Sequence, residues 1–439
     1  MKAIPTELAT LLPANPNLDI VAWEDLEVSF QEKIASAIAT SHLPSCAVFP
    51  HSQEALGEVV KIVHKKSWQV LVIGSGSKVS WGGLVKKADL VISTQKLSRL
   101  IDHAVGDLTV TLEAGMPLAQ VQEILHKEKQ FLPIDPAYPQ SATIGGIIAT
   151  ADTGSWRQRY GGIRDMVLGI SFVRADGEIA KAGGRVVKNV AGYDLMKLLT
   201  GSFGTLGVIS QVTLRTYPLL QDSQTMFLSG EEKAIAMTVQ TLLNSALTPT
   251  AADLLSPGVV KTLVSQKGFG LIVRFQSLTA SIEAQSQRIE ELGNELGLQA
   301  TTYQGDAERE LWQRSHSLVN NPLSPNSVIS KIGVLPSSAT ATLAYLDEVT
   351  SGEGFGLIHN SSGIGKLQLN SEKSFNQIQK LRSHCEQNQG FLTILESPQQ
   401  LKQKLEPWGY TGNAMTMMQR VKNKFDPQNI LSPGRFLEL

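Results

Sequence analysis

The sequence predicts a two-domain α+β protein, and the main reason is a change of pattern at Pro218. From about Cys46 to Pro218, short apolar strands alternate with glycine-rich segments. After Pro218 glycine becomes less frequent, and longer amphipathic helices alternate with strands. That pattern is typical of helices layered on one face of an antiparallel sheet. We expect an N-terminal helical segment at 1–45, a first domain at 46–217, a second domain at 218–410 and a C-terminal tail at 411–439.

The elements of the first domain follow from apolar spacing and from proline and glycine. A helix is predicted over 53–64, a second helix begins near Pro117, and a hairpin turns at Asp176-Gly177. The residues expected on the buried faces of the two helices are Leu56, Val59, Val60 and Val63 in the first, and Leu118, Val121 and Leu125 in the second. Strands are expected over 69–73, 89–93 and 108–112.

In the second domain, apolar periodicity predicts four helices and four strands. The helices are expected over about 231–245, 279–296, 337–349 and 372–388, and the strands near 269–275, 327–335, 354–369 and 390–396. No internal repeat is evident in the sequence. The tail contains a helix followed by a segment rich in proline, and we expect it to pack back across the first domain.

Composition excludes several classes of protein. The 439 residues include 39 Lys and Arg against 40 Asp and Glu, so the net charge of −1 favours neither nucleic acid nor an anionic membrane. Two cysteines, Cys46 and Cys385, are too few for the four thiolates of an iron–sulfur cluster and argue against a disulfide framework. No apolar run reaches membrane-spanning length and no secretory signal is evident. We expect a cytoplasmic protein, with any association to the inner face of a membrane made through partners.

The most informative segment is 70–83, Val-Leu-Val-Ile-Gly-Ser-Gly-Ser-Lys-Val-Ser-Trp-Gly-Gly. An apolar strand ends there in closely spaced glycines, which allow positive φ and close approach of a ligand. Successive amides in such a turn form an anion-binding concavity. The dinucleotide motif would need glycine where Val79 stands, and no Gly-Lys-Ser/Thr follows at P-loop spacing. The segment is therefore a nucleotide loop of another kind, or a tight strand-to-loop turn.

Two further segments carry similar chemistry. Residues 139–154, Pro-Gln-Ser-Ala-Thr-Ile-Gly-Gly-Ile-Ile-Ala-Thr-Ala-Asp-Thr-Gly, offer a hydroxyl, unobstructed amides and small side chains against which a flat group could lie. The alternative is a loop that opens a close-packed helix. Residues 161–209 place a short helix from Tyr193 between glycines and then enter an alternating strand. Such repetition within one domain indicates a long ligand held largely by backbone.

Together these three segments resemble the FAD-binding domain of the vanillyl-alcohol oxidase/p-cresol methylhydroxylase (PCMH) flavoproteins. The branch they resemble most is that of glycolate oxidase and D-lactate dehydrogenase. Within it, Lys188-Asn189-Val190-Ala191-Gly192-Tyr193-Asp194-Leu195 and the Ala-Thr-Ile-Gly-Gly segment are similar to the E subunit of glycolate oxidase. The resemblance is dense over about 46–217, returns over Phe425 to Gly434, and is thin between them.

The resemblance implies a PCMH-type FAD-binding domain and a ferredoxin-like antiparallel cap. It implies that residues 74–78 wrap the FAD diphosphate, helped by amides of Thr143 to Gly146. The residues that it marks for FAD are Gly74, Ser75, Gly76, Ser77, Lys78, Gly82, Pro139, Ser141, Thr143, Gly145, Gly146, Ile163, Gly204, Val208 and Ile209. Covalent relatives attach flavin through a histidine in the glycine loop or later. No histidine occurs in 74–83, so we expect FAD to be bound non-covalently.

The chain departs from its catalytic relatives at two places. Phe203 stands where these relatives often have glutamate, a change that also occurs in accessory-type relatives. In the cap, relatives that oxidise 2-hydroxy acids carry Gly-His-x-Gly-Asp-Gly-Asn-x-His, whose histidines hold a metal or the substrate. The nearest counterpart is 359–368, where Ile364, Lys366 and Gln368 replace Asp, Asn and His. His359 alone is a poor metal site, so we expect no metal.

Arg314 and His316 are the candidate catalytic residues. Leu311-Trp312-Gln313-Arg314-Ser315-His316 resembles the cap helix of the family. Oxidation of a hydroxy acid needs a cation for the carboxylate, which Arg314 could supply, and a base near neutral pH, which His316 could supply. The alternative is that both residues lie on a solvated helix face. Lys366 could replace lost positive charge or be a surface lysine.

Three functions remain open from the sequence. The leading hypothesis is an FAD-binding subunit of a glycolate or other 2-hydroxy acid dehydrogenase complex, with a sister flavoprotein subunit and an iron–sulfur subunit that takes the electrons. The second is a self-sufficient FAD-dependent dehydrogenase of D-lactate, glycolate or a related acid. The third is a structural subunit with a vestigial flavin site, which the intact glycine segments disfavour.

Overall fold

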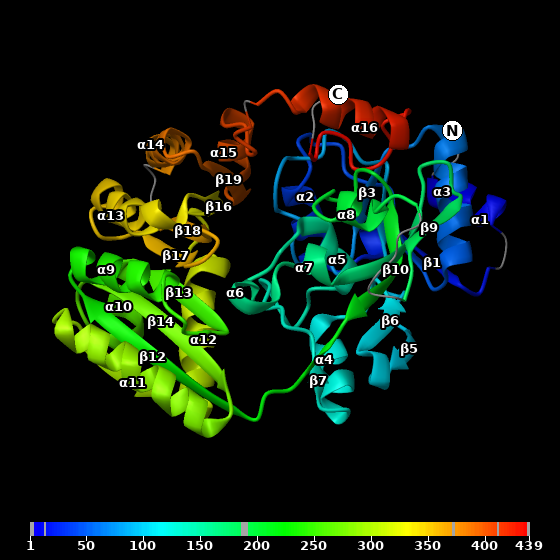
Figure 1. Cartoon of the computed structure of the whole chain (residues 1–439). Coiled ribbons are helices and arrows are strands. Elements are labelled where there is room, and N and C mark those ends of the chain that lie inside the picture. The colour runs from blue at the N-terminus through cyan, green and yellow to red at the C-terminus, as the bar shows by residue number, and fades with distance from the viewer. Residues whose placement is uncertain (1–3, 13–14, 186–191, 371–373, 411, 437–439) are drawn as a thin grey trace. The chain divides into compact units, whose positions relative to one another are not determined.

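A computed structural model describes residues 4–12, 15–185, 192–370, 374–410 and 412–436 of the chain (Figure 1). The chain divides into two units. Unit 1 comprises Met1–Thr153, Gly162–Pro218 and Tyr410–Leu439, and unit 2 comprises Gly154–Gly161 and Leu219–Gly409. The Lys-Asn-Val-Ala part of the segment similar to the E subunit lies outside the described residues.

The first sheet of unit 1 has the order β1-β2-β4-β3. Its strands are β1 (Leu18–Ala22), β2 (Cys46–Pro50), β3 (Val70–Ile73) and β4 (Leu90–Ser93), and the helices in the same stretch are α1 (Ile4–Leu11), α2 (Val28–Ser36) and α3 (Gln53–Lys66). Strand β4 is parallel to both β2 and β3, whereas β1 pairs antiparallel with β2. The N-terminal segment, expected to be helical and separate, therefore contributes a strand to this sheet.

The second sheet of unit 1 is antiparallel, in the order β5-β6-β10-β8-β9. Its strands are β5 (Leu100–Ala104), β6 (Thr109–Glu113), β8 (Val167–Val173), β9 (Ile179–Gly183) and β10 (Val208–Arg215), and a separate pair joins β7 (Gln130–Phe131) to β11 (Tyr217–Pro218). The helices are α4 (Leu118–Lys127), α5 (Ile144–Thr150), α7 (Ile163–Met166) and α8 (Leu195–Leu199). Leu118, Val121 and Leu125 are the buried residues of α4, as predicted.

The chain re-enters unit 1 at Tyr410, and after α16 (Met415–Phe425) its C-terminal tail lies along β3, an edge strand of the first sheet (Figure 1). The amide of Val70 donates to the carbonyl of Ile430 at 2.8 Å, and the amide of Ser432 donates to the carbonyl of Val70 at 2.8 Å. The tail thus covers backbone groups that an edge strand would otherwise expose.

A buried ion pair fixes this tail. Lys422 is 4% exposed, and its Nζ lies 2.6 Å from Oδ2 of Asp426, which is fully buried. The same ammonium donates to the carbonyls of Thr205 at 2.9 Å and Leu431 at 3.0 Å. The Asp426 carboxylate also accepts the amides of Ile430 and Leu431. Both charges are therefore surrounded by hydrogen-bond partners, which a buried pair requires.

Unit 2 contains one antiparallel sheet of eight strands, in the order β15-β12-β14-β13-β17-β18-β16-β19. The elements are α6 (Arg157–Tyr160), β12 (Asp222–Gly230), α9 (Glu232–Leu243), β13 (Ala251–Leu255), α10 (Pro257–Val264), β14 (Phe269–Ser277), α11 (Thr279–Glu295), β15 (Gln299–Tyr303), α12 (Gly305–Asn320), β16 (Ser327–Gly333), α13 (Ala339–Thr350), β17 (Phe355–His359), β18 (Ile364–Asn370), α14 (Ser374–Gln387), β19 (Phe391–Glu396) and α15 (Gln399–Lys404).

The sheet is built from two similar halves, a structural repeat that the sequence did not reveal. The second half has the element order βαββαβ, with helices α13 and α14. The first half has the same order, with helices α9 and α11, except that α10 is inserted between β13 and β14 (Figure 1). The halves meet where β13 pairs antiparallel with β17, with Asp253 opposite His359. This is a doubled form of the expected ferredoxin-like cap. The single strand expected at 354–369 is instead the two strands β17 and β18, joined by a turn at Gly363 with φ +65°.

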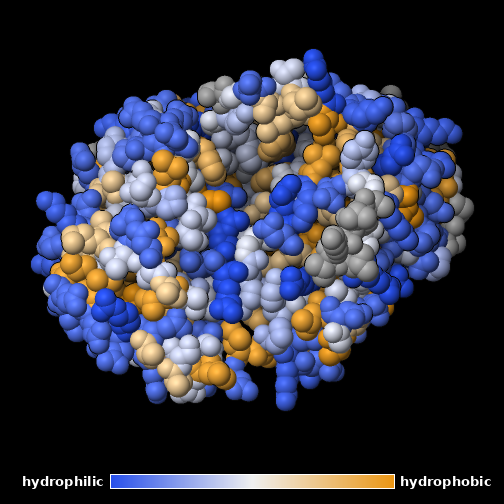
Figure 2. Space-filling view, viewed as in Figure 1, coloured by the Kyte–Doolittle hydropathy of each residue, from blue (hydrophilic) through white to orange (hydrophobic). Residues whose placement is uncertain are grey.

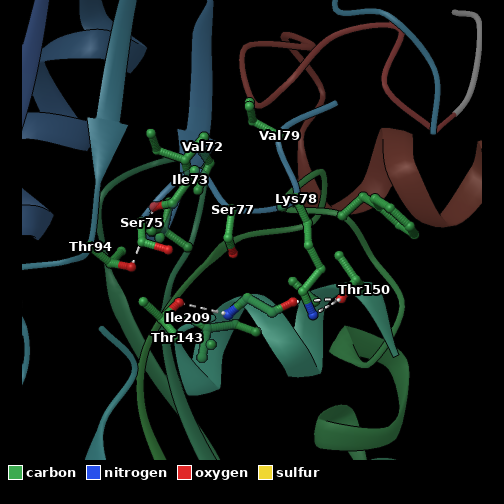
Figure 3. A pocket seen from close by; sticks show the side chains of 18 of the residues that line it. Val72, Ile73, Ser75, Ser77, Lys78, Val79, Thr94, Thr143, Thr150 and Ile209 are labelled. Atoms are coloured by element: carbon green, nitrogen blue, oxygen red, sulfur yellow. Dashed lines mark hydrogen bonds between the residues drawn. The ribbon is translucent and has the colours of Figure 1, made fainter. Parts of the chain in front are cut away.

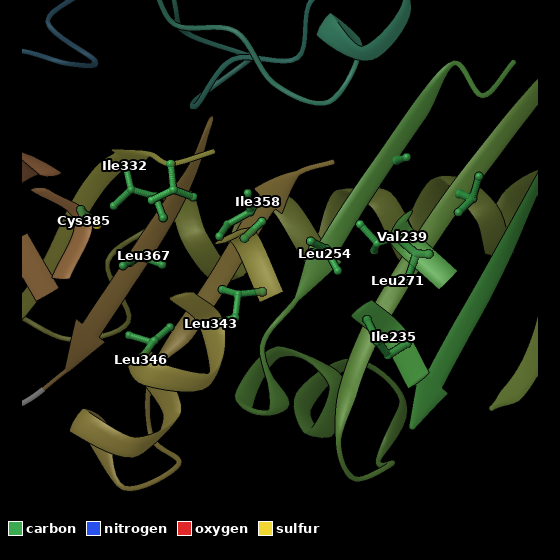
Figure 4. Close-up of a cluster of buried hydrophobic side chains, with 14 of the residues drawn as sticks. Ile235, Val239, Leu254, Leu271, Ile332, Leu343, Leu346, Ile358, Leu367 and Cys385 are labelled. Carbon is green, nitrogen blue, oxygen red and sulfur yellow. The ribbon is translucent and has the colours of Figure 1, made fainter. Parts of the chain in front are cut away.

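Helices cover both faces of this sheet, which corrects the expectation of a single covered face. One face packs against α9, α11, α13 and α14, with Leu254, Leu271 and Ile358 in its core (Figure 4). The other packs against α10 and α12, around Leu255 and Trp312. Central strand β13 is buried at all of its positions, so its sequence does not alternate between apolar and polar residues.

The surface of the protein is mainly hydrophilic. Hydrophilic side chains cover most of the surface visible in Figure 2, and apolar ones occur in small scattered groups. Within the described residues, no helix is long and apolar enough to cross a membrane.

Cys46 and Cys385 are both free and buried, and burial raises the pKa of each thiol to about 12.

Replacing Lys422 with methionine tests the ion pair that holds the tail. Lys422→Met leaves the Asp426 carboxylate buried without its cation, so we expect a loss of about 3–5 kcal/mol in the free energy of unfolding. Chemical denaturation followed by tryptophan fluorescence measures this loss. Lys424→Met, at an exposed position of the same helix, is the control and should be close to neutral. Equal stability of the two variants would contradict this role of the pair.

Candidate functional site

An open pocket lies in unit 1 at the end of β3 (Figure 3). Its lining comes from five segments distant in sequence: the end of β3 with the loop after it, Thr94 after β4, α5 with its N-terminal cap, the start of β10 with the turn before it, and the tail. The lining residues are Val72, Ile73, Gly74, Ser75, Gly76, Ser77, Lys78, Val79, Thr94, Thr143, Gly145, Gly146, Ala149, Thr150, Phe203, Gly204, Gly207, Val208, Ile209 and Arg435. The three glycine-rich segments singled out in the sequence therefore converge on one pocket.

The loop after β3 presents unused backbone donors to this pocket. No described residue accepts a hydrogen bond from the amides of Gly74, Ser75, Gly76 or Ser77. Gly76 has φ +77°, a conformation that favours glycine. A run of free amides that lines a pocket suits an anion such as a diphosphate.

Gly74 is required for a different reason. A Cβ atom built on Gly74 would lie 2.1 Å from Oγ1 of Thr143, so the two segments can approach only if position 74 has no side chain. This contact brings the loop after β3 against the cap of α5. Ser75 strengthens the junction, since its Oγ donates to the carbonyl of Ser141 at 2.6 Å.

The amides at the start of α5 are already used within the protein. Ile144 and Gly145 donate to the carbonyls of Met116 and Ala114, and Gly146 donates to Oγ1 of Thr143 at 3.2 Å. The expectation that amides over Thr143 to Gly146 help to bind a diphosphate is corrected for these three. Thr143, Gly145 and Gly146 do line the pocket, and their small size shapes its wall.

Lys78 lines the pocket and forms a buried ion pair with Asp152. Its side chain extends toward Thr150 (Figure 3), and its Nζ lies 2.9 Å from Oδ2 of Asp152. The two side chains are 4% and 2% exposed, and Asp152 also accepts the amide of Ala137 at 2.8 Å. The positive charge of Lys78 is therefore balanced by a carboxylate of the protein.

The turn before β10 places an aromatic side chain at the pocket. Phe203 adopts φ +53°, and its amide donates to the carbonyl of Ala149 at 2.8 Å. Its ring stacks on Phe436 of the tail, with centroids 6.3 Å apart. The position at which catalytic relatives often have glutamate is thus part of the apolar wall.

Eleven of the residues marked for FAD from the sequence line the pocket, and Gly82, Pro139, Ser141 and Ile163 do not. Ile163 is buried, and its amide donates to Oγ1 of Thr153. The pocket is also lined by Thr94, Thr150, Gly207 and Arg435, which were not predicted from the sequence to bind FAD. Arg435 belongs to the tail that was expected to pack on this domain. That expectation is the one feature of the sequence that could have suggested Arg435 as a pocket residue.

Unit 2 contains a second polar cluster, around the carboxylate of Asp253. Nδ1 of His359 lies 2.7 Å from Oδ1 of Asp253, and the hydroxyl of Ser155 donates to Oδ2. Nε2 of His316 lies 2.7 Å from Oγ of Ser155. Asp253 is fully buried and Ser155 and His359 nearly so. His316 therefore belongs to a network rather than to a solvated helix face.

The hydrogen bonds define the roles of these groups. Burial raises the pKa of Asp253, but the charge of His359 and hydrogen bonds from His316 and His359 outweigh it, so the pKa is lowered overall. An ionised carboxylate only accepts, so Nδ1 of His359 donates to it and Nε2 carries the lone pair when the ring is neutral. No described residue bonds this Nε2. The result is an imidazole oriented by a carboxylate.

The other candidates of the cap lie apart from this network. Arg314 is half exposed, donates to the carbonyl of Thr262 at 3.2 Å and lies 3.6 Å from Glu310. The structure does not bring it together with His316. Lys366 donates to Oδ1 of Asn320, and Gln368 donates to the carbonyl of Leu318 at 2.6 Å. Within the described parts of the chain, no group of three or more His, Cys, Asp or Glu could hold a metal ion.

Comparison with known proteins agrees with this geometry. Residues 44–183 match the FAD binding domain family, and residues 401–436 match the C-terminal domain of FAD linked oxidases. The fold is that of p-cresol methylhydroxylase, with a TM-score of 0.77 at 14% identity over 98% of this chain and 95% of that one. The 4-ethylphenol oxidase of Gulosibacter chungangensis gives 0.74 at 14% identity over 99% and 97%.

The solved structures and the family match thus agree on a PCMH-type FAD-binding fold. The D-lactate dehydrogenase of Archaeoglobus fulgidus is 26% identical over 405 residues, 88% of this chain and 90% of the relative. The glycolate oxidase subunit GlcE of Escherichia coli is 33% identical over 169 residues, 38% of this chain and 47% of the relative. Over most of its length the chain is similar to proteins named as dehydrogenases of D-lactate and of D-2-hydroxyglutarate.

Gly74→Ala tests the close approach that builds the pocket. The added methyl group collides with Thr143, so we expect a stability loss of about 1–3 kcal/mol and a lower FAD content after purification. Denaturant unfolding and flavin absorbance measure the two effects. Gly106→Ala, at a position with open space around it, is the control. Normal stability and full FAD content in the Gly74→Ala variant would contradict the packing argument.

The low pKa of Asp253 predicts a pH dependence of stability. The unfolded carboxyl has a pKa of about 3.9, so below that pH the unfolded state binds more protons than the folded state. The stabilisation from the ionised carboxylate is therefore complete above about pH 5 and is lost as the pH falls below about 4. Thermal unfolding of wild type and Asp253→Asn should differ most at neutral pH and converge in acid. Asp306→Asn, at an exposed carboxyl, should show no such convergence. If the difference between wild type and Asp253→Asn were constant with pH, the assignment would be wrong.

Proposed function

We propose that this chain binds FAD non-covalently in the pocket after β3 and is the flavin-binding subunit of a 2-hydroxy acid dehydrogenase complex. Glycolate or a similar acid is the substrate of the complex, a sister flavoprotein subunit contributes to its oxidation, and an iron–sulfur subunit takes the electrons. When bound, FAD supplies the two-electron acceptor. The free amides of Gly74 to Ser77 fit its diphosphate, and the absence of histidine from 74–83 favours non-covalent attachment.

The observation that carries the subunit assignment is that side chains of the cap segment 359–368 make structural contacts within the cap. Relatives that the sequence resembles place metal- or substrate-binding side chains there. In this chain Lys366 and Gln368 instead join β18 to α12 through Asn320 and the carbonyl of Leu318. Ile364, which stands where those relatives have aspartate, has no ligating atom. The similarity to GlcE, 33% identity over 169 residues, supports the same assignment.

A second candidate is a self-sufficient dehydrogenase of a D-2-hydroxy acid. Two observations favour it. Relatives with this kind of name align over about nine-tenths of both chains, among them the D-2-hydroxyglutarate dehydrogenase of Xanthomonas citri at 27% identity. In addition, His359 is oriented by Asp253 and keeps Nε2 available, as a proton acceptor for a hydroxyl group would require.

Anaerobic stopped-flow absorbance separates the two. The purified, FAD-loaded chain is mixed with glycolate and, separately, with D-lactate, and the flavin band near ~450 nm is followed. We expect the flavin of the isolated chain to remain oxidised with both acids, because the cap segment lacks the ligands of catalytic relatives, and to be reduced when the partner subunits are added. Reduction within seconds in the isolated chain would contradict the subunit assignment and favour the second candidate. His359→Gln should then slow that reduction, whereas Arg420→Gln at an exposed position should not.

A further inference from the structure

Arg435 is an unusual residue of the pocket because its charge has no counterpart in the protein. It is 5% exposed and lines the pocket beside the loop after β3. Its Nη2 donates to the carbonyl of Lys78 at 3.2 Å, but its Nη1 is buried and has no partner among the described residues. No described Asp or Glu pairs with the guanidinium. A buried cation without an anion is costly for the chain alone.

The surrounding structure holds Arg435 in this position. The backbone of Arg435 accepts the amide of Gly83 at 3.1 Å, and a Cβ atom on Gly83 would lie 2.7 Å from that carbonyl oxygen. Gly434 turns the chain with φ +80°. Upstream, Lys422 and Asp426 fix the start of the tail. The fold thus fixes an unpaired guanidinium beside an anion-binding loop.

The carboxylate near the pocket is not available to this arginine. Asp152 is already the partner of Lys78, with 2.9 Å between the charged atoms. The remaining donors nearby are the free amides of Gly74 to Ser77, which also favour negative charge. Guanidinium and amides therefore present one combined receptor for an anion that the protein does not contain.

We infer that Arg435 is a cofactor-binding residue that pairs through Nη1 with the diphosphate of FAD. This inference rests on the proposed binding of FAD in the same pocket. It assigns to the C-terminal tail a direct part in holding the cofactor, in addition to its packing along β3. The pairing also explains why the fold retains a buried charge that destabilises the chain when the cofactor is not bound.

The inference predicts opposite effects of one substitution on stability and on binding. In the chain freed of FAD, Arg435→Met removes an unbalanced buried charge, so the apparent melting temperature should rise. The same variant should bind FAD about 10- to 100-fold more weakly, the range for loss of a charge-assisted hydrogen bond. ADP, which carries the diphosphate without the flavin, should lose affinity by a similar factor. Arg435→Lys should keep part of the affinity, and Arg420→Met, an exposed position on the same tail, should change neither quantity.

Titration of the apo chain with FAD, followed by flavin fluorescence, and competition by ADP measure the affinities, and differential scanning fluorimetry measures the melting temperatures. A lower apo melting temperature with unchanged FAD affinity would assign Arg435 a structural role and overturn the inference. Loss of affinity for FAD but not for ADP would place its partner away from the diphosphate and would also overturn it. A wild-type chain that bound no FAD would contradict the proposed function itself, an outcome distinct from equal binding by wild type and variant.

Discussion

The buried pair of Lys422 and Asp426 is the interaction on which the pocket depends. Its ammonium joins α16 to the carbonyls of Thr205 and Leu431, and its carboxylate binds the amides of the tail. These bonds set the tail along β3, and β3 leads directly into the loop with free amides. One satisfied ion pair, far along the chain from the glycine loop, therefore determines the wall of the site and the position of Arg435.

The glycines of the site have different physical tasks, and only some concern a ligand. Gly74 and Gly83 are needed because protein atoms occupy the space of a side chain: Thr143 at one and the tail backbone at the other. Gly76 is needed for its backbone conformation, which helps to leave amides of the loop unpaired. A glycine-rich segment can thus be both a packing junction and a binding loop. The binding function is carried by the amides rather than by glycine as such.

Much of the fold follows from local sequence, but the functional contacts do not. Apolar periodicity was sufficient to predict α3 and α4, because one face of each helix packs against a hydrophobic core. It failed for β5 and β15, whose residues are exposed or half-buried, and for the helix-covered second face of the cap sheet. The three glycine segments were recognisable because local chemistry marks them. Arg435 and the pair of Asp253 with His359 were not, because they depend on the path of the tail and on strand register.

The central claim is that the loop after β3 and the tail form a receptor for one FAD molecule that is not covalently attached. The most direct measurement is titration of the apo chain with FAD, followed by acid precipitation and assay of flavin in the supernatant. The account predicts saturation at about one FAD per chain, with all of the flavin released on precipitation. Failure to bind FAD, or flavin that remains with the precipitated protein, would contradict it.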